Sequence, residues 1–166
     1  MSANRLPDVR LRDTAGVIVP PPALYGAALI IALALHYVVL PLRIASPPTG
    51  LLLPLAGMAL IILGLSLSIA VMRSFGRAGT PVPPSCPTTR FVSAGPYRYT
   101  RNPDYIGQTL LYTGIALVTN SWWPLILLPL VLLVVHYGVV RREERYLEGK
   151  FGQEYRNYTA RVRRWL

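Results

Sequence analysis

Ionisable and aromatic side chains gather in two short parts of this sequence. The first, residues 91–105, holds a run of tyrosines and contains Asp104 near its end. The second, residues 141–158, begins with the adjacent carboxylates Glu143 and Glu144 among arginines. Carboxylates accept hydrogen bonds and protons, and tyrosine hydroxyls both donate and accept. These two segments therefore hold the candidate chemistry of the chain.

The elements that must position these segments are membrane helices. The chain is 52% hydrophobic and 14% charged, whereas soluble domains average about 25% charged residues. Charges are missing between Asp13 and Arg43, between Arg43 and Arg73, and between Asp104 and Arg141. A spanning helix needs about 20 apolar residues. The first two stretches therefore predict one helix each, and the third, interrupted at 120–124, predicts two short helices.

The sequence thus predicts an all-α integral membrane protein with four transmembrane helices, whose cytoplasmic loop and C-terminal helices form the functional site. The expected spans are 21–42, 51–72, 105–119 and 122–140. A single domain, 1–166, then divides into a cytoplasmic tail (1–20), two packing spans (21–72), a cytoplasmic loop (73–104), a helical hairpin (105–140) and cytoplasmic helices (141–166).

The net charge of +10 follows from the expected topology. With four spans, all of the 17 lysines and arginines except Arg43 lie on one side of the membrane. The positive-inside rule assigns that side to the cytoplasm. We expect a multi-pass protein of the cell (inner) membrane with both termini cytoplasmic and with Pro47 and Ser121 on the far side. Topology and attraction to anionic lipid account for the charge, so no nucleic-acid partner is expected.

The N-terminal apolar run and the cysteine count exclude several further features. The run beyond residue 20 is longer than the 7–15 residues typical of a signal peptide, so we expect a retained first helix. The single cysteine, Cys86, excludes an intramolecular disulfide and a multi-cysteine zinc site. We expect Cys86 to be a bystander in a loop, and we expect no metal.

The expected topology brings the two chemical segments to one side of the membrane. Asp104 precedes the third span, and Glu143 and Glu144 follow the fourth, so a pocket bounded by two helix ends and an aromatic loop is predicted. His136 and Glu143 are seven residues apart and share a helix face, and ionisable groups in membrane helices usually face a cavity or a partner. The two glutamates alternatively form only a solvated, ion-paired helix end. For His36 we expect a structural role.

Three ordered motifs carry a resemblance to a known family. Residues 95–107 read Gly-Pro-Tyr-Arg-Tyr-Thr-Arg-Asn-Pro-Asp-Tyr-Ile-Gly, residues 142–147 read Arg-Glu-Glu-Arg-Tyr-Leu, and residues 151–158 read Phe-Gly-Gln-Glu-Tyr-Arg-Asn-Tyr. Together they resemble the isoprenylcysteine carboxyl methyltransferase family, which belongs with the integral-membrane phospholipid and isoprenylcysteine methyltransferases. The motifs cover residues 79–166, and the first two spans match in hydropathy only.

The resemblance implies a methyltransferase that uses S-adenosylmethionine. Carried over by position, the cofactor-binding residues are Thr89, Arg90, Phe91, Val92, Tyr97, Asn102, Pro103, Asp104, Tyr105 and Glu143. Arg101 is a further candidate, with contact to lipid phosphate as its other interpretation. Asn102 stands where many members have histidine, and an amide cannot carry a proton. Val139 stands one turn before Glu143, where the isoprenylcysteine enzymes have a substrate-contacting arginine.

Methyl transfer from a sulfonium needs alignment and desolvation, which contribute roughly 7–11 kcal/mol. Tyr97, Tyr99 and Tyr105 are expected to offer ring faces to the sulfonium. If the acceptor is an amine, Glu144 or His136 takes its proton. If it is a carboxylate, no base is needed, and Arg141 or Arg142 supplies the counter-charge that Val139 lacks.

We expect an amphiphilic acceptor, because a cytosolic one would not need four membrane helices around so small a site. Its tail is expected to enter through the hairpin, whose aliphatic lining is Leu110, Leu111, Ile115, Leu128 and Leu132. The missing arginine favours a lipid headgroup or another amphiphilic nucleophile over a prenylated cysteine. Two other classes remain open: an NADPH-dependent membrane reductase with a related helical arrangement, and a non-catalytic membrane module. The lack of a Gly-x-Gly-x-x-Gly motif argues only against a Rossmann domain.

Overall fold

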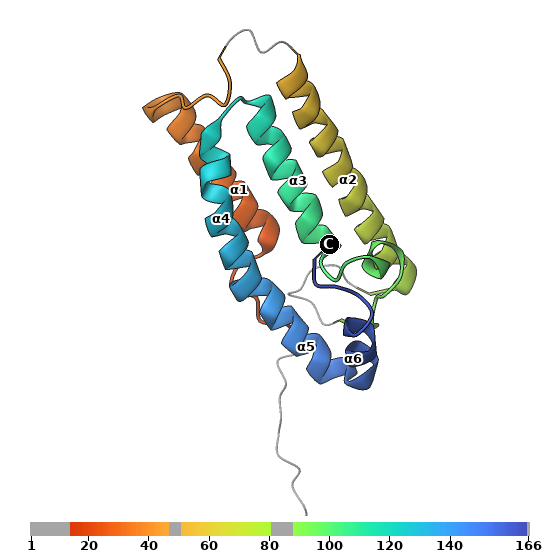
Figure 1. Cartoon of the computed structure of the whole chain (residues 1–166). Helices are drawn as coiled ribbons and strands as arrows, with labels where there is room; N and C mark the ends of the chain where they lie inside the picture. Colours follow the sequence, from red (N-terminus) through yellow and green to blue (C-terminus); the bar gives the residue numbers. More distant parts are fainter. Residues whose placement is uncertain (1–13, 47–50, 81–87, 166) are drawn as a thin grey trace, which may run out of the picture.

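The computed structural model describes residues 14–46, 51–80 and 88–165, and every regular element in these ranges is helical (Figure 1). In chain order the elements are α1 (Pro21–Ala34), the π-helical turn η1 (Leu35–Val39), α2 (Leu52–Ala78), the 3-10 turn η2 (Gly95–Arg98), α3 (Pro103–Val118), α4 (Trp122–Val135), the π-helical turn η3 (His136–Val140), α5 (Arg141–Phe151) and α6 (Gln153–Thr159). The expectation of an all-α protein is confirmed. Cys86, Pro47 and most of the tail 1–20 lie outside the described residues.

Proline and glycine mark the ends of these helices. Pro21 and Pro103 begin α1 and α3, where a missing backbone N–H costs nothing. Gly79 ends α2 with φ of 64°, a left-handed conformation that glycine adopts readily. Gly152 separates α5 from α6 with φ of 51°. The positions at which these helices begin and end are therefore determined by the local sequence.

Three helices are long and apolar enough to cross a membrane: Pro21–Val39, Leu52–Ala78 and Trp122–Phe151. The third is continuous because η3 joins α4 to α5 without a break. α3 has 16 residues, about 24 Å at 1.5 Å per residue, which is shorter than the hydrocarbon core of about 30 Å. Three of the four expected spans thus have the length and hydropathy of a membrane helix.

α2 and α3 approach each other along paired glycines. A β carbon on Gly57 would lie 2.6 Å from the carbonyl oxygen of Gly114, and one on Gly64 would lie 2.7 Å from that of Gly107. Real β carbons essentially never come so close to backbone atoms. Small residues allow such contact between helices in lipid, where packing replaces the hydrophobic effect.

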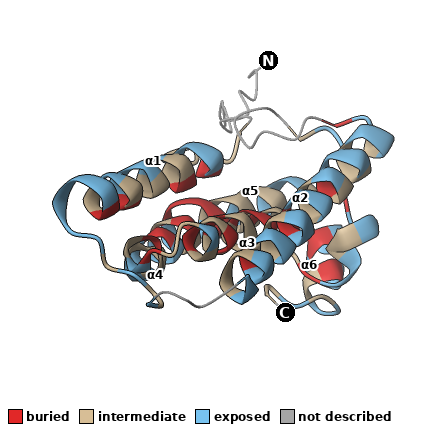
Figure 2. Ribbon diagram, turned by 90° about the horizontal axis from the view of Figure 1, so that it is seen from above, coloured by how far each residue is buried: buried red, intermediate tan, exposed pale blue. Residues whose placement is uncertain are grey.

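α1 packs on α3 and α4 through a buried cluster of aromatic and β-branched side chains. The rings of Tyr25 and Tyr112 meet edge to face with centroids 5.9 Å apart, and Val131 and Val135 of α4 are buried beside them. α3 lies between α1 and α2, and the outward faces of α1 and α2 are mostly exposed (Figures 1 and 2). Such apolar exposed faces suit contact with lipid.

Candidate active site

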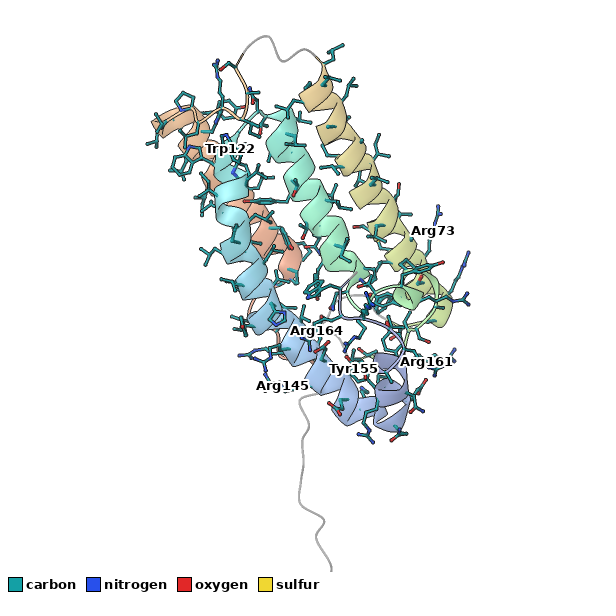
Figure 3. The ribbon with its side chains drawn as sticks, viewed as in Figure 1. Arg73, Trp122, Arg145, Tyr155, Arg161 and Arg164 are labelled. Atoms are coloured by element: carbon teal, nitrogen blue, oxygen red, sulfur yellow. The ribbon has the colours of Figure 1, made fainter. Side chains whose placement is uncertain are left out.

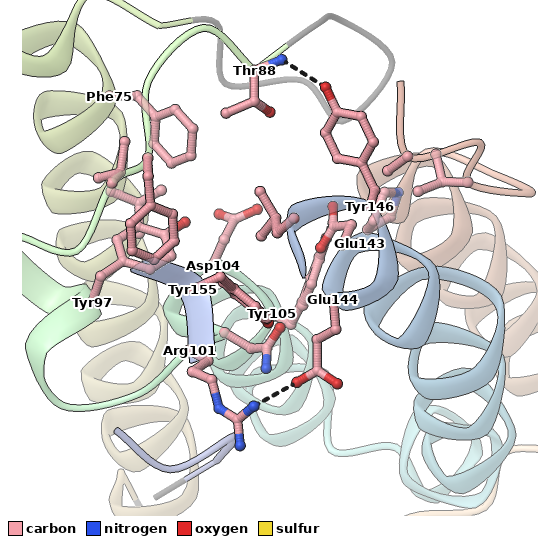
Figure 4. A pocket seen from close by; sticks show the side chains of 18 of the residues that line it. Phe75, Thr88, Tyr97, Arg101, Asp104, Tyr105, Glu143, Glu144, Tyr146 and Tyr155 are labelled. Carbon is pink, nitrogen blue, oxygen red and sulfur yellow. Dashed lines mark hydrogen bonds and ion pairs between the residues drawn. The ribbon is translucent and has the colours of Figure 1, made fainter. Parts of the chain in front are cut away.

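A cavity of about 310 Å³ lies at the end of the helical bundle that carries α5 and α6 (Figures 1 and 4). Its walls come from the segment before α1, the last turns of α2, the loop before α3, the first turn of α3, and α5 and α6. This volume is at the lower end of the range for small-molecule sites, about 300–1,000 Å³. Residues distant in the sequence therefore share one site.

Nine of the residues singled out from the sequence line this cavity: Phe91, Val92, Tyr97, Arg101, Asn102, Asp104, Tyr105, Glu143 and Glu144. They come from both chemical segments, because the start of α3 lies beside the long helix Trp122–Phe151, which continues past it into α5 (Figure 1).

Other sequence-predicted residues lie outside the cavity lining. Thr89 and Arg90 are exposed, and the Thr89 amide donates to Thr80 Oγ1 at 2.9 Å. Pro103 is buried at the start of α3. Arg142 Nη1 donates to the carbonyl oxygen of Gly16 at 3.0 Å. Tyr99, expected to offer a ring face to the sulfonium, is 78% exposed and does not line the cavity.

His136 also lies outside the cavity lining, and its ring packs near Trp165 with centroids 6.4 Å apart. The expectation that it shares a helix face with Glu143 assumed regular α-helix. The residues between them include the π-helical turn η3, and such a turn shifts the register of the following residues. The two side chains therefore point in different directions.

Two cavity carboxylates lack a cationic partner. The hydroxyl of Tyr105 donates to Glu143 Oε1 at 2.8 Å, and Gln108 Nε2 donates to Asp104 Oδ2 at 2.8 Å. Among the described residues neither Glu143 nor Asp104 forms an ion pair. Buried carboxylates are usually paired, so this end of the cavity is suited to a positively charged ligand.

Glu144, one residue further along α5, is fully paired. Arg101 Nη1 donates to its Oε1 at 3.1 Å, and Arg164 donates to both of its oxygens, through Nε at 2.9 Å and Nη2 at 2.7 Å. The interpretation of the two adjacent glutamates as an ion-paired helix end therefore holds for Glu144 and fails for Glu143. Both carboxylate oxygens of Glu144 already accept hydrogen bonds from guanidinium groups, so neither is left free for a substrate.

Aromatic side chains form the other wall, and several were missed by the sequence reasoning. Phe91 is surrounded by Phe151, Tyr155 and Tyr158 at centroid distances of 5.6, 5.8 and 5.1 Å. Tyr97 packs against Phe75 at 5.8 Å. Tyr155 and Tyr158 belong to the third motif and are three residues apart. This spacing was the feature of the sequence that could have identified them as part of the site.

The tyrosines of this wall keep their protons. Burial, together with the nearby carboxylates of Asp104 and Glu143, raises the pKa of Tyr97 well above its usual range. Burial and Glu144 raise the pKa of Tyr155 to about 12. The hydroxyls are therefore neutral hydrogen-bond donors at physiological pH.

The C-terminal residues close the site from outside. Arg101 donates its amide to the carbonyl oxygen of Arg163 at 3.0 Å, and the carbonyl oxygen of Arg164 accepts from Thr100 Oγ1 at 3.1 Å and from Asn102 Nδ2 at 2.8 Å. The amide of Asn102, an expected cofactor ligand, is thus already engaged. Nothing in the local sequence around Arg164 indicated this role.

Comparisons with known proteins agree with a membrane methyltransferase. The family model described as phospholipid methyltransferase matches residues 53–154, from α2 to α6. The chain belongs to the phospholipid methyltransferase family, and its sequence resemblance to that group is confirmed. All expected site residues fall within the match. The family implies a methyltransferase, and it supports neither the reductase nor the non-catalytic module.

One relative is an uncharacterised protein of Haemophilus influenzae (strain ATCC 51907 / DSM 11121 / KW20 / Rd). It is 41% identical to this chain over 62 residues, which are 37% of this chain and 78% of the relative. No solved structure matches the chain.

Proposed function

We propose that this chain transfers a methyl group from S-adenosylmethionine to an amine-bearing amphiphile at the cytoplasmic face of the membrane. The observation that carries the proposal is the pairing of unneutralised carboxylates, Glu143 and Asp104, with aromatic rings around one cavity of a phospholipid methyltransferase family member. S-adenosylmethionine bears a sulfonium and an ammonium group, and both suit such a lining.

Individual residues have separate tasks in this proposal. When bound, the cofactor supplies an activated methyl group whose sulfur leaves neutral. Glu143, oriented by Tyr105, accepts hydrogen bonds from the cofactor. Tyr97 and Phe91 exclude water and attract the cationic centre. Asp104 takes the proton of an amine acceptor, because Glu144 is paired with two arginines and Glu143 is assigned to the cofactor.

The charges around the cavity favour an amine over a carboxylate acceptor. Arg101 is engaged by Glu144, and Val139, which replaces the family arginine, is 1% exposed in the core. Arg141 and Arg142 do not line the cavity. An acceptor carboxylate would meet Asp104 and Glu143 without a free counter-charge. A lipid amine headgroup has the complementary charge.

The acceptor tail reaches the cavity between α1 and α2 in our proposal. None of the aliphatic residues expected to form a gate in the hairpin of α3 and α4 lines the cavity. The lining instead includes Pro21 and Pro22 at the start of α1, and Val71 and Phe75 near the end of α2. These two helices lie on either side of α3 (Figure 1), so a route between them faces the bilayer.

We further propose that α3 is a fourth span and that both termini face the cytoplasm of the cell (inner) membrane. The distribution of basic residues supports this orientation, since among the described residues only Arg43 lies at the end of the bundle where α1 ends and α2 begins. The short length of α3 is tolerated because α2 and α4 flank it.

Calorimetry with S-adenosylmethionine and its demethylated product tests the cofactor site. We expect Glu143→Ala and Tyr105→Ala to weaken binding at least about tenfold, because a hydrogen bond to a charged group contributes roughly 1.5–3 kcal/mol. Tyr99→Ala is the control, since this side chain points to solvent. Unchanged affinity in both site variants would remove these residues from the site, and stabilisation by NADPH in place of S-adenosylmethionine would overturn the proposed activity.

Radiolabelled S-adenosylmethionine tests the acceptor. The purified protein is incubated with membrane lipid extracts and, separately, with prenylcysteine analogues. We expect label in aminophospholipids. Label only in prenylcysteine would show that the family arginine is dispensable, and label only in water-soluble molecules would contradict the route between α1 and α2.

A further inference from the structure

The outward face of the long helix Trp122–Phe151 carries an apolar strip that ends in arginines. Leu130, Leu133 and Tyr137 follow one another at intervals of three and four residues, and each is more than half exposed. Arg141 and Arg145 continue the series at intervals of four and are also exposed. Spacing of this kind places Leu130 with Leu133 on one face of α4 and Arg141 with Arg145 on one face of α5. The π-helical turn η3 lies between the two helices, and the Arg141 guanidinium over the Tyr137 ring joins the two faces across it. The face therefore changes from aliphatic to aromatic to basic along its length.

The two arginines on this face lack counter-ions. Glu144 is engaged by Arg101 and Arg164, and the nearby Glu148 pairs with Arg156 at 3.8 Å. Within the described ranges neither Arg141 nor Arg145 forms an ion pair.

These arginines are nevertheless oriented by their neighbours. The Arg141 guanidinium lies over the ring of Tyr137, 5.6 Å from its centroid. Arg145 Nε donates to the carbonyl oxygen of Arg141 at 3.1 Å. Both side chains are thus held close to the helix, and no carboxylate of the described residues pairs with either guanidinium group.

Arg164 adds a third guanidinium from the C-terminal segment. Together with Tyr137, Arg141, Arg145 and the two glutamates it lines a surface hollow. Arg145 and Arg164 lie beside α5, whereas Arg73 lies beside α2 on the opposite side of the molecule (Figure 3). Glu143 and Leu147 line the catalytic cavity and not this hollow. The hollow is therefore a separate site, and Glu144 and Arg164 form the wall nearest the cavity.

We propose that this hollow and the apolar strip below it bind an anionic phospholipid. The phosphodiester accepts hydrogen bonds from Arg141 and Arg145, whose planar guanidinium groups match phosphate oxygens. One acyl chain lies along Leu133 and Leu130. A free phosphate ion would use only the arginines, so the aligned apolar strip favours a lipid. This lipid is distinct from the methyl acceptor, and its binding does not depend on catalysis.

Native mass spectrometry of the detergent-purified protein, titrated with phosphatidylglycerol, tests this site. The double variant R141A/R145A is compared with the matched double variant R73A/R77A, which removes two exposed arginines four residues apart near the end of α2. We expect R141A/R145A to hold the lipid about tenfold more weakly or worse, because it loses two charge-assisted contacts. R73A/R77A is expected to retain wild-type affinity. Phosphatidylcholine is expected to bind the wild type more weakly than phosphatidylglycerol.

Three results would overturn the proposal. Equal loss in both double variants would show general attraction of arginines to anionic lipid. Displacement of the lipid by millimolar inorganic phosphate would show a free-anion site. Undiminished binding by R141A/R145A would place the lipid elsewhere. Should the double variant fail to fold, the single variants Arg141→Gln and Arg145→Gln are measured in the same way, and each is expected to weaken binding. S-adenosylmethionine affinity, measured in parallel, separates failure of this site from failure of the proposed catalytic function.

Discussion

The seam between α2 and α3 and the cover over the cavity are stabilised in opposite ways. The seam is the contact of Gly57 and Gly64 with Gly114 and Gly107, and in the described residues no side-chain hydrogen bond joins these two helices. The cover consists of residues 88–102 and 141–165. It is held by the ion pairs of Glu144, by backbone carbonyls of the C-terminal segment, and by three rings packed around Phe91.

The difference follows from the surroundings of each region. Between helices in lipid, apolar association gains little, and close backbone contact supplies the stabilisation. At the aqueous end, burial of aromatic rings is favourable, and polar groups that lose water need partners. The seam is therefore sensitive to size, whereas the cover is sensitive to loss of charge and hydrogen bonds.

The largest effect is expected from Gly64→Leu in the seam. Its side chain would have to displace the backbone of α3 at Gly107, and such overpacking costs about 3 kcal/mol or more. Thermal unfolding in detergent should show a strongly lowered Tm or no folded protein. Gly76→Leu in the same helix is the control, because a side chain there meets nothing. Equal melting of the two variants would mean that the seam is not size-limited.

An intermediate effect is expected from Arg164→Ala in the cover. It leaves Glu144 with Arg101 alone. Because Arg164 is partly exposed, the loss of stability should stay near 1 kcal/mol or below. S-adenosylmethionine binding should weaken about fivefold, since Arg101 and Glu144 both line the cavity and a loss of about 1 kcal/mol corresponds to that factor.

The matched control for this change is Arg163→Ala, because Arg163 contributes its backbone carbonyl, which the substitution keeps. Arg164→Lys should restore part of the affinity. If Arg163→Ala weakens binding as much as Arg164→Ala does, net charge and not the ion pair controls the site.

At physiological pH the smallest effect is expected from Tyr155, because its titration changes stability only at high pH. Its pKa in the folded chain is about 12, above its ordinary value near 10. Between these values the folded state keeps a proton that the unfolded chain has lost, so stability falls as pH rises past about 10 and is unaffected by this group below about 9. Tm measured from pH 8 to 11.5 should fall less in Tyr155→Phe than in the wild type. Tyr99→Phe, at an exposed position, should follow the wild-type curve, and coincidence of all three curves would contradict the assignment.

Much of the fold was predictable because membrane insertion depends on local composition. The stretches without charge located the helices Pro21–Val39, Leu52–Ala78 and Trp122–Phe151, since each residue adds to the hydropathy of its own segment. The expectation that Asp104 and Glu143 share a pocket followed from helix ends at the same membrane face, and both line one cavity.

By itself, then, the sequence determined the helical class, the approximate spans and which two segments meet. Only the tertiary structure decided the partners of individual side chains. Adjacent Glu143 and Glu144 have different partners because Arg164 returns from the C-terminus to only one of them. The same segment engages Asn102, and η3 turns His136 away from Glu143. Hydropathy is a sum over neighbours in sequence, whereas a hydrogen bond depends on atoms that meet in space after the whole chain has folded.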